Sequence, residues 1–130
     1  MKGSRSRARA VVEQLTSAWL AGDEDAIART LTDDVRWWTP LTGDRADGPA
    51  GTSAVLGQLL EPLPQPLRLA ALVASDDGSR CVVEMRSDPP GPGAPPALVT
   101  SVVTLRDGRI SAGRTYTDLQ GRAAYAARRS

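Results

Sequence analysis

The chain of 130 residues contains no histidine and one cysteine, Cys81. A single cysteine cannot form an intrachain disulfide. Zinc and copper sites depend on imidazole and thiolate ligands, so we expect no site for either metal. Catalytic Ser-His and Cys-His pairs are likewise excluded within one chain. A magnesium or calcium site built from carboxylates alone is compatible with the composition, but no EF-hand or phosphate-loop motif occurs, and we expect no cofactor.

Phenylalanine is also absent, and aromatic residues make up 4% of the chain. Hydrophobic residues nevertheless reach 41%, so Val, Leu, Ala and Ile must fill most of the core. An aromatic side chain beside a pocket is therefore expected to shape that pocket. The length predicts one domain over residues 1–130, with flexible ends at 1–6 and 121–130.

The sequence also lacks a charge excess and a long apolar run. A formal net charge of +1 argues against nucleic-acid binding, which rests on many phosphate contacts. The apolar pair at 11–12 is followed at once by Glu13 and Gln14, so we predict no signal peptide. No segment approaches the length of a transmembrane helix. We therefore expect a cytoplasmic protein that does not bind membranes.

Helical patterns occupy the first half of the chain. Val12, Leu15 and Trp19 recur at helical spacing and predict an amphipathic helix over residues 5–21, which Gly22 is suited to end.

A second, shorter helix is predicted after Asp23, which is suited to the N-cap position. Ile27 and Leu31 form its buried side, and the acidic pair at 33–34 breaks the pattern. A third helix is predicted over residues 53–61.

Strand patterns dominate the second half. Proline-rich connectors at 62–66 and 89–96 exclude helix there. A polar loop is predicted at 41–50. The predicted strands cover residues 35–39, 67–74, 80–88, 98–105 and 109–118.

This order of elements predicts an α+β domain. Three helices would pack on the concave side of a cone-shaped, curved antiparallel sheet. The concave face of such a sheet encloses a cavity, where a small-molecule ligand is expected.

Several short motifs, in order, carry a family resemblance. These are Trp19-Leu20-Ala21-Gly22-Asp23, Leu31-Thr32-Asp33-Asp34-Val35, Trp38 two residues before Pro40, Gly48 to Gly51, Asp107-Gly108-Arg109-Ile110 and Arg114-Thr115-Tyr116-Thr117-Asp118. Together they resemble the SnoaL-like branch of the nuclear-transport-factor-2-like superfamily, which has a cystatin-like fold. The resemblance implies a cone-shaped α+β barrel that often dimerises through its sheet. The superfamily includes ketosteroid isomerases, polyketide cyclases, limonene-epoxide hydrolases and proteins that only bind ligands.

The triplet Arg86-Ser87-Asp88, with Asp118 thirty residues after Asp88, resembles the limonene-epoxide hydrolases more specifically. The resemblance implies that Asp118 is a general base, Asp88 a general acid and Arg86 the bridge between them. The substrate-binding residues predicted with them are Arg36 and Trp38, Glu84, and Tyr116. Arg36 and Trp38 share a face of the first strand, Glu84 shares a face with Arg86 and Asp88, and Tyr116 shares one with Asp118.

Other features argue against this site. Charges that alternate along a strand are typical of a solvated outer face, and Asp88 precedes a proline, where turn-forming Asp is common. The hydrolases position water with a Tyr and an Asn where this chain has Arg36 and Trp38. Steroid isomerases carry an Asp base where this chain has Thr39.

The sequence therefore predicts a cofactor-independent acid/base enzyme acting on an apolar, oxygenated small molecule. Epoxide opening, by hydrolysis or cyclisation in secondary metabolism, is the leading reaction. A polyketide cyclase or isomerase of the SnoaL type is the first alternative, and a non-catalytic small-molecule-binding protein is the second. We expect a homodimer, and a purely structural role through dimerisation is a further alternative.

Overall fold

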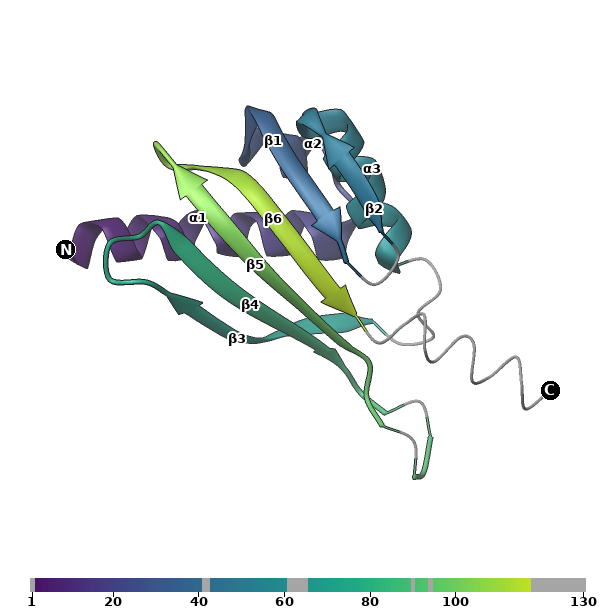
Figure 1. Cartoon of the computed structure of the whole chain (residues 1–130). Coiled ribbons are helices and arrows are strands. Elements are labelled where there is room, and N and C mark those ends of the chain that lie inside the picture. Colours follow the sequence, from purple (N-terminus) through teal and green to yellow (C-terminus); the bar gives the residue numbers. More distant parts are fainter. Residues whose placement is uncertain (1, 41–42, 61–65, 90, 94, 118–130) are drawn as a thin grey trace.

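A computed structural model describes residues 2–40, 43–60, 66–89, 91–93 and 95–117. Along the chain the elements are α1 (Lys2–Ala21), α2 (Glu24–Arg29), β1 (Leu31–Thr39), β2 (Asp44–Asp47), α3 (Gly48–Leu60), β3 (Leu67–Ala74), β4 (Arg80–Ser87), β5 (Leu98–Arg106) and β6 (Arg109–Thr117). Figure 1 shows the strands side by side in one curved sheet, with α1 running behind it.

Helix α1 has the amphipathic character that its sequence predicts. Val12, Leu15 and Trp19 are each at most 1% exposed and form its buried side. Gly22 adopts a φ of +69°, and its N–H donates to the Trp19 carbonyl at 3.1 Å, which ends the helix. The helix begins at Lys2, three residues before the predicted start, so it includes most of the end predicted to be flexible; residues 121–130 lie outside the described part of the chain.

The start of α2 confirms the predicted N-cap. The Asp23 carboxylate accepts a hydrogen bond from the Ala26 N–H at 3.1 Å. Leu31, however, belongs to β1, which starts four residues earlier than predicted. The acidic pair at 33–34 does not break the strand, because both side chains point to solvent and Asp34 accepts hydrogen bonds from Thr32 (2.8 Å) and Arg106 (2.6 Å).

Strand β2 and the first three residues of α3 fall where a loop was predicted. The sequence of β2, Asp-Arg-Ala-Asp, has little intrinsic strand preference. It is a strand because its backbone pairs with β1, with Trp38 opposite Arg45. Gly48, at a φ of +79°, then turns the chain into α3 five residues earlier than predicted.

The six strands lie in the order β2-β1-β6-β5-β4-β3. Strands β3 to β6 form the predicted antiparallel meander, and β1 pairs with β6 in parallel. The α+β fold with three helices against a curved, unclosed sheet is thus confirmed, with this one parallel pair in an otherwise antiparallel sheet.

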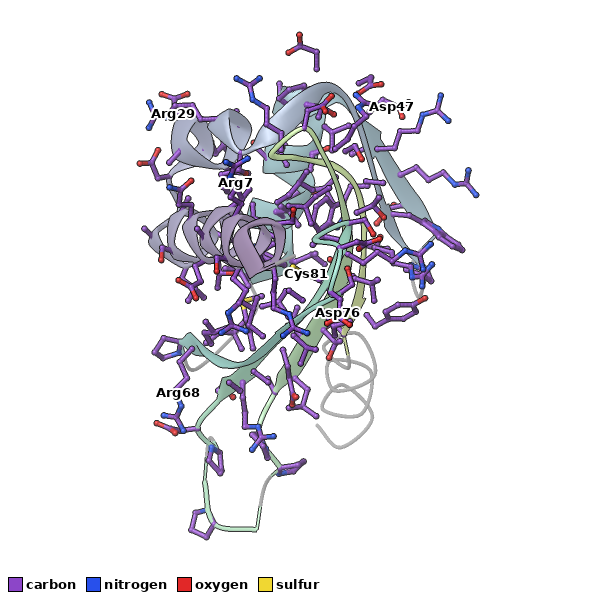
Figure 2. The ribbon with its side chains drawn as sticks, turned by 90° about the vertical axis from the view of Figure 1, so that its left-hand side faces the viewer. Arg7, Arg29, Asp47, Arg68, Asp76 and Cys81 are labelled. Atoms are coloured by element: carbon purple, nitrogen blue, oxygen red, sulfur yellow. The ribbon has the colours of Figure 1, made fainter. Side chains whose placement is uncertain are left out.

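The sheet has two different faces. Helix α1 packs on β3 and β4, and α3 packs on β1, so we call the side that meets these helices the covered face and the other side the open face. Figure 2 shows the helices gathered on one side of the sheet, with Cys81 between α1 and the strands. Buried and exposed residues alternate along β1 and β4, as expected for a sheet covered on one side.

The helices were compared with the requirements for a membrane-spanning segment. None in the described part of the chain has both the length and the apolarity needed to cross a bilayer.

Candidate functional site

The substrate-binding and bridging residues predicted from sequence all lie on the open face. Their side chains stand at alternate positions whose neighbours are buried under the helices. The structure thus brings these residues to one side of the sheet, but to the side away from the helices. They are Arg36, Trp38, Glu84, Arg86 and Tyr116.

The predicted bridge between Arg86 and Asp88 is not assembled in an enclosed pocket. Arg86 donates to Glu84 at 3.2 Å, while Asp88 is paired with Arg68 at 2.8 Å. The Asp88 side chain is 65% exposed. The physical reason is the strand alternation: Met85 and Ser87 occupy the inward positions at this end of β4. Such exposed ion pairs are typical of a solvated strand face.

The two adjacent tryptophans have opposite environments. Trp38, the predicted pocket residue, is 39% exposed on the open face, and the Arg45 guanidinium lies 5.3 Å from its ring centre. Trp37 is 1% exposed and lies on the covered face. Alternation along β1 thus puts the two rings on opposite faces, and Trp37 is the one that meets the interior.

Arg36 and Tyr116 are surface residues. The Arg36 side chain is 85% exposed and lies 3.9 Å from Asp47, and Tyr116 is 40% exposed. Asp118, the predicted general base, lies outside the described residues, directly after the buried Thr117 at the end of β6. Its predicted role therefore stays a prediction.

The buried polar groups on the covered side of the sheet are uncharged among the described residues. Within the described part of the chain, every buried polar residue is a serine or a threonine. Apart from Thr32 near the start of β1, those on the sheet gather toward the end at which β1 and β6 finish: Thr39, Ser87, Ser101, Thr115 and Thr117. These hydroxyl groups can hold a neutral oxygen-bearing ligand, but they are not acids or bases near neutral pH.

Two of these hydroxyl groups and the Trp37 indole are joined by hydrogen bonds. The Trp37 indole N–H donates to the Thr115 hydroxyl at 2.8 Å, and the Thr115 and Ser101 hydroxyl oxygens lie 2.9 Å apart. All three residues are at most 1% exposed. Strand pairing sets this geometry, because Ser101 and Thr115 are direct partners across β5 and β6. We call these residues the hydroxyl relay.

Gly113 makes room for the tryptophan of the relay. A Cβ atom at this position would lie 2.4 Å from the Trp37 ring, far closer than atoms can approach. The missing side chain thus allows the ring to lie flat against β6, where its N–H meets Thr115. Sequence reasoning did not single out the relay, because serine and threonine are common in strands and cross-strand register cannot be read from one sequence.

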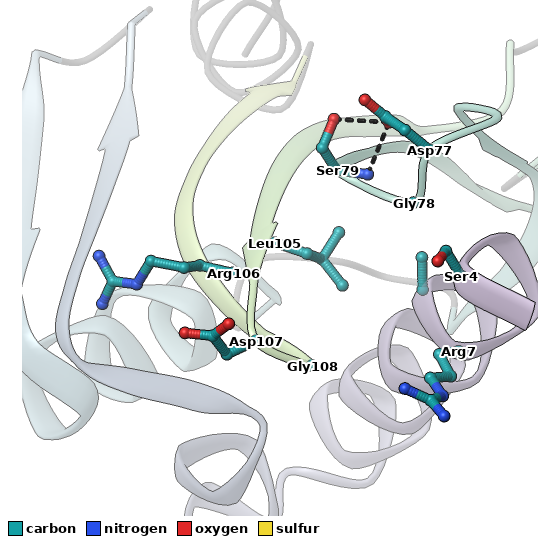
Figure 3. A pocket seen from close by; sticks show the side chains of 10 residues that line it. Ser4, Arg7, Asp77, Gly78, Ser79, Leu105, Arg106, Asp107 and Gly108 are labelled. Carbon is teal, nitrogen blue, oxygen red and sulfur yellow. Dashed lines mark hydrogen bonds between the residues drawn. The ribbon is translucent and has the colours of Figure 1, made fainter. Parts of the chain in front are cut away.

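Two surface hollows lie at the other end of the sheet. One, of about 310 Å³, lies between the start of α1 and the β3–β4 and β5–β6 turns, beside Ser4, Arg7 and Asp107 (Figure 3). At its edge Asp77 accepts hydrogen bonds from the Ser79 N–H (3.0 Å) and hydroxyl (2.8 Å), which hold the pKa of Asp77 at about 2. This carboxylate therefore stabilises the turn between β3 and β4.

The comparisons with known proteins agree with this architecture. A SnoaL-like domain model matches residues 12–113. A candidate polyketide cyclase from Xanthomonas campestris pv. campestris is 27% identical, with a TM-score of 0.69 over 93% of this chain and 97% of that chain.

More distant structures share the same fold. A candidate SnoaL-like polyketide cyclase from Jannaschia sp. CCS1 is 21% identical, with a TM-score of 0.72 over 92% of this chain and 91% of that one. A candidate ketosteroid isomerase from Kribbella flavida is 19% identical, with a TM-score of 0.69 over 87% and 78%. No curated protein sequence matches the chain. Because the domain model spans most of its length, the chain belongs to the SnoaL-like family.

Proposed function

We propose that the protein binds a small, apolar, oxygen-bearing molecule on the covered face and converts it by isomerase- or cyclase-type acid/base chemistry. The observation that carries this proposal is the hydroxyl relay, a set of neutral hydrogen-bonding groups inside an apolar fold. Its surroundings are buried apolar side chains such as Val83, Val99 and Met85. Apolar walls with a few placed polar groups are the usual composition of a small-molecule site.

Proton transfer needs a group that the described interior does not supply. Buried hydroxyls orient a substrate oxygen, but a general base at neutral pH is a carboxylate or another titrating group. Asp118 follows Thr117 at the end of β6, at the end of the sheet where the interior hydroxyls gather. We propose Asp118 as the catalytic base, which requires that the alternation of β6 does not continue past Thr117, because Tyr116 lies on the open face.

Epoxide opening is an alternative reaction in the same place. It needs a carboxylic acid beside the epoxide oxygen in addition to the base. Arg86 and Asp88 do not meet this need, because both are exposed and paired with other side chains. The isomerase or cyclase reaction, which one base and neutral donors can support, fits the described residues better.

We also propose that the protein is a homodimer formed through the open face. Among the described residues, five of the exposed large hydrophobic side chains lie on this face: Trp38, Val73, Val82, Leu98 and Tyr116. Glu84 and Arg114 lie on the two strands that flank β5. A two-fold axis along β5 would therefore bring Glu84 of one copy opposite Arg114 of the other. A second copy of the same face thus complements both its apolar and its charged positions.

The test of the acid/base proposal compares two aspartates. Turnover would be screened with panels of cyclic ketones, polyketide-like diketones and epoxides. We expect Asp118→Asn to lower kcat at least about a hundredfold, the usual scale for removal of a general base, while the open-face control Asp88→Asn keeps its activity. Unchanged turnover in Asp118→Asn would reject the catalytic proposal. Tight ligand binding without turnover in the wild type would instead support the binding-protein alternative.

A further inference from the structure

We infer that the outer edge of β3, which we call the β3 edge, is a surface for strand pairing with β3 of a second copy of this chain, and that Arg9 keeps it closed. The inference goes beyond the proposed function. It is also separate from the open-face dimer, because the edge lies in the plane of the sheet and belongs to neither face. Pairing of two such edges would join two sheets into one.

The two outer strands of the sheet differ in length and in charge. Within the described part of the chain, the order of strands ends with β2 on one side and with β3 on the other (Figure 1). Strand β2 has four residues, and all but Ala46 are charged, which discourages pairing with another chain. Strand β3 has eight residues and no charge after Arg68. A long apolar edge of this kind favours pairing with a further strand.

The apolar side chains of the β3 edge are accessible. Val73 is 64% exposed and Leu69 is 40% exposed, and Ala70 and Ala71 between them are exposed as well. The pairing of β3 with β4 shifts its register between Leu69 and Ala71. Such a bulge bends an edge strand and weakens its pairing with another chain, but it leaves the stretch that follows it regular.

The backbone of Leu72 in that regular stretch faces away from β4. The Ser75 N–H donates to the Arg80 carbonyl at 2.8 Å, and hydrogen-bonded pairs alternate with non-hydrogen-bonded pairs along an antiparallel ladder. Counting back from Ser75, Leu72 and its partner Val83 form a non-hydrogen-bonded pair. The N–H and the carbonyl of Leu72 therefore point outward, to the place where a further strand would pair with them.

Arg9 of α1 occupies this outward carbonyl. Its guanidinium donates to the Leu72 carbonyl oxygen at 2.8 Å. The Arg9 side chain is exposed and comes from a helix that packs on β3. A second strand needs the same carbonyl as an acceptor, so its N–H group would have to replace the guanidinium. Arg9 thus closes the β3 edge as long as this bond persists.

The chemistry of the edge favours a second copy as its occupant. An antiparallel strand paired with itself about a two-fold axis offers the same backbone donors and acceptors from both sides. Residues 69–74 are uncharged, so no like charges meet across such an axis. The exposed apolar side chains of the two copies would lie side by side, which removes apolar surface from water.

The test compares two arginines of the same helix. Arg7 and Arg9 are both exposed, and Arg7→Ala and Arg9→Ala each remove one positive charge and introduce a strong helix former. Sedimentation velocity at micromolar concentration takes the mass of the wild type as its reference. We expect Arg9→Ala to reach at least about twice that mass and Arg7→Ala to keep it. Hydrogen exchange in residues 69–75 of Arg9→Ala should slow as its concentration rises, because outward amides become paired.

A second variant locates the association. Arg9→Ala combined with Ala70→Lys places a charge within the uncharged stretch and should return to the mass of the wild type. An unchanged mass for Arg9→Ala would overturn the inference, as would an equal gain for Arg7→Ala, which would trace the association to net charge. A gain in mass without slower exchange at residues 69–75 would place the contact elsewhere and also overturn it.

A foreign strand is the remaining occupant. An unrelated apolar peptide that slows exchange at residues 69–75 of Arg9→Ala, while the variant alone keeps the mass of the wild type, would assign the edge to another protein and overturn the pairing of two copies. None of these outcomes depends on ligand turnover, so failure of this inference leaves the proposed function intact.

Discussion

The two faces of the sheet divide the polar residues of this protein by kind. The open face carries arginines and carboxylates that pair with each other in solvent, together with Trp38 and Tyr116. The covered face carries hydroxyls and the Trp37 indole, fully buried and joined by hydrogen bonds. Charged residues are the usual candidates for a functional site in a sequence, but in this protein the described residues of the enclosed side are neutral. The comparison shows that ionisable residues in alternate strand positions mark the solvent side of this sheet.

The largest difference between the two faces is expected when the two adjacent tryptophans are replaced by alanine in turn. Trp37→Ala removes a ring that is 1% exposed, and such changes cost about 3–5 kcal/mol of unfolding free energy. Trp38→Ala removes a ring that is 39% exposed, and we expect a cost below about 1 kcal/mol for the monomer. Denaturant unfolding at low protein concentration measures both. Equal losses would show that the two faces are not different environments.

A charge on the open face tests its proposed role as a dimer interface. Val82 is 42% exposed and lies opposite Val73 and Val102 in neighbouring strands. Val82→Asp should turn the dimer into a monomer, because two copies of the new carboxylate would be buried in the interface. Sedimentation velocity at micromolar concentration measures the state, with Arg80→Ala on the same strand as a matched control. A monomeric wild type would contradict the interface.

The smallest effect is expected from an open-face ion pair. Hydrogen bonds from Arg106 and Thr32 lower the pKa of Asp34 from 3.8 to about 2. Because the folded-state pKa is depressed, this contribution to stability is present above about pH 4 and is lost as the pH falls toward 2. Asp34→Asn should therefore flatten the pH dependence of unfolding between these values, as followed by circular dichroism. An unchanged acid-unfolding profile would show that the exposed pair contributes nothing.

Much of the fold could be predicted from the sequence because local physics decides it. The Asp23 cap, the end of α1 at Gly22 and the span of β3 at 67–74 follow from side-chain capping, glycine conformation and strand composition. Strand β2 could not be predicted, because its backbone pairing with β1 overrides a sequence of poor strand preference.

The site was harder to predict for a different reason. Alternation shows that Trp37 and Trp38 lie on opposite faces, but it does not say which face the helices cover. The prediction that Arg36, Glu84 and Arg86 belong to a site rested on a family resemblance and on shared strand faces, and neither of these says which face of the sheet is enclosed. The relay depends on the register of Ser101 with Thr115, which is a property of the folded sheet.

The most direct test of the account follows the indole N–H signals of Trp37 and Trp38 by NMR during titration with acetophenone. The Trp37 N–H donates to Thr115 at 2.8 Å inside the relay, whereas Trp38 lies on the open face. The account predicts a saturable shift of the Trp37 signal and a Trp38 signal that stays in place. A shift of Trp38 with an unmoved Trp37 would place the ligand on the open face and contradict the account.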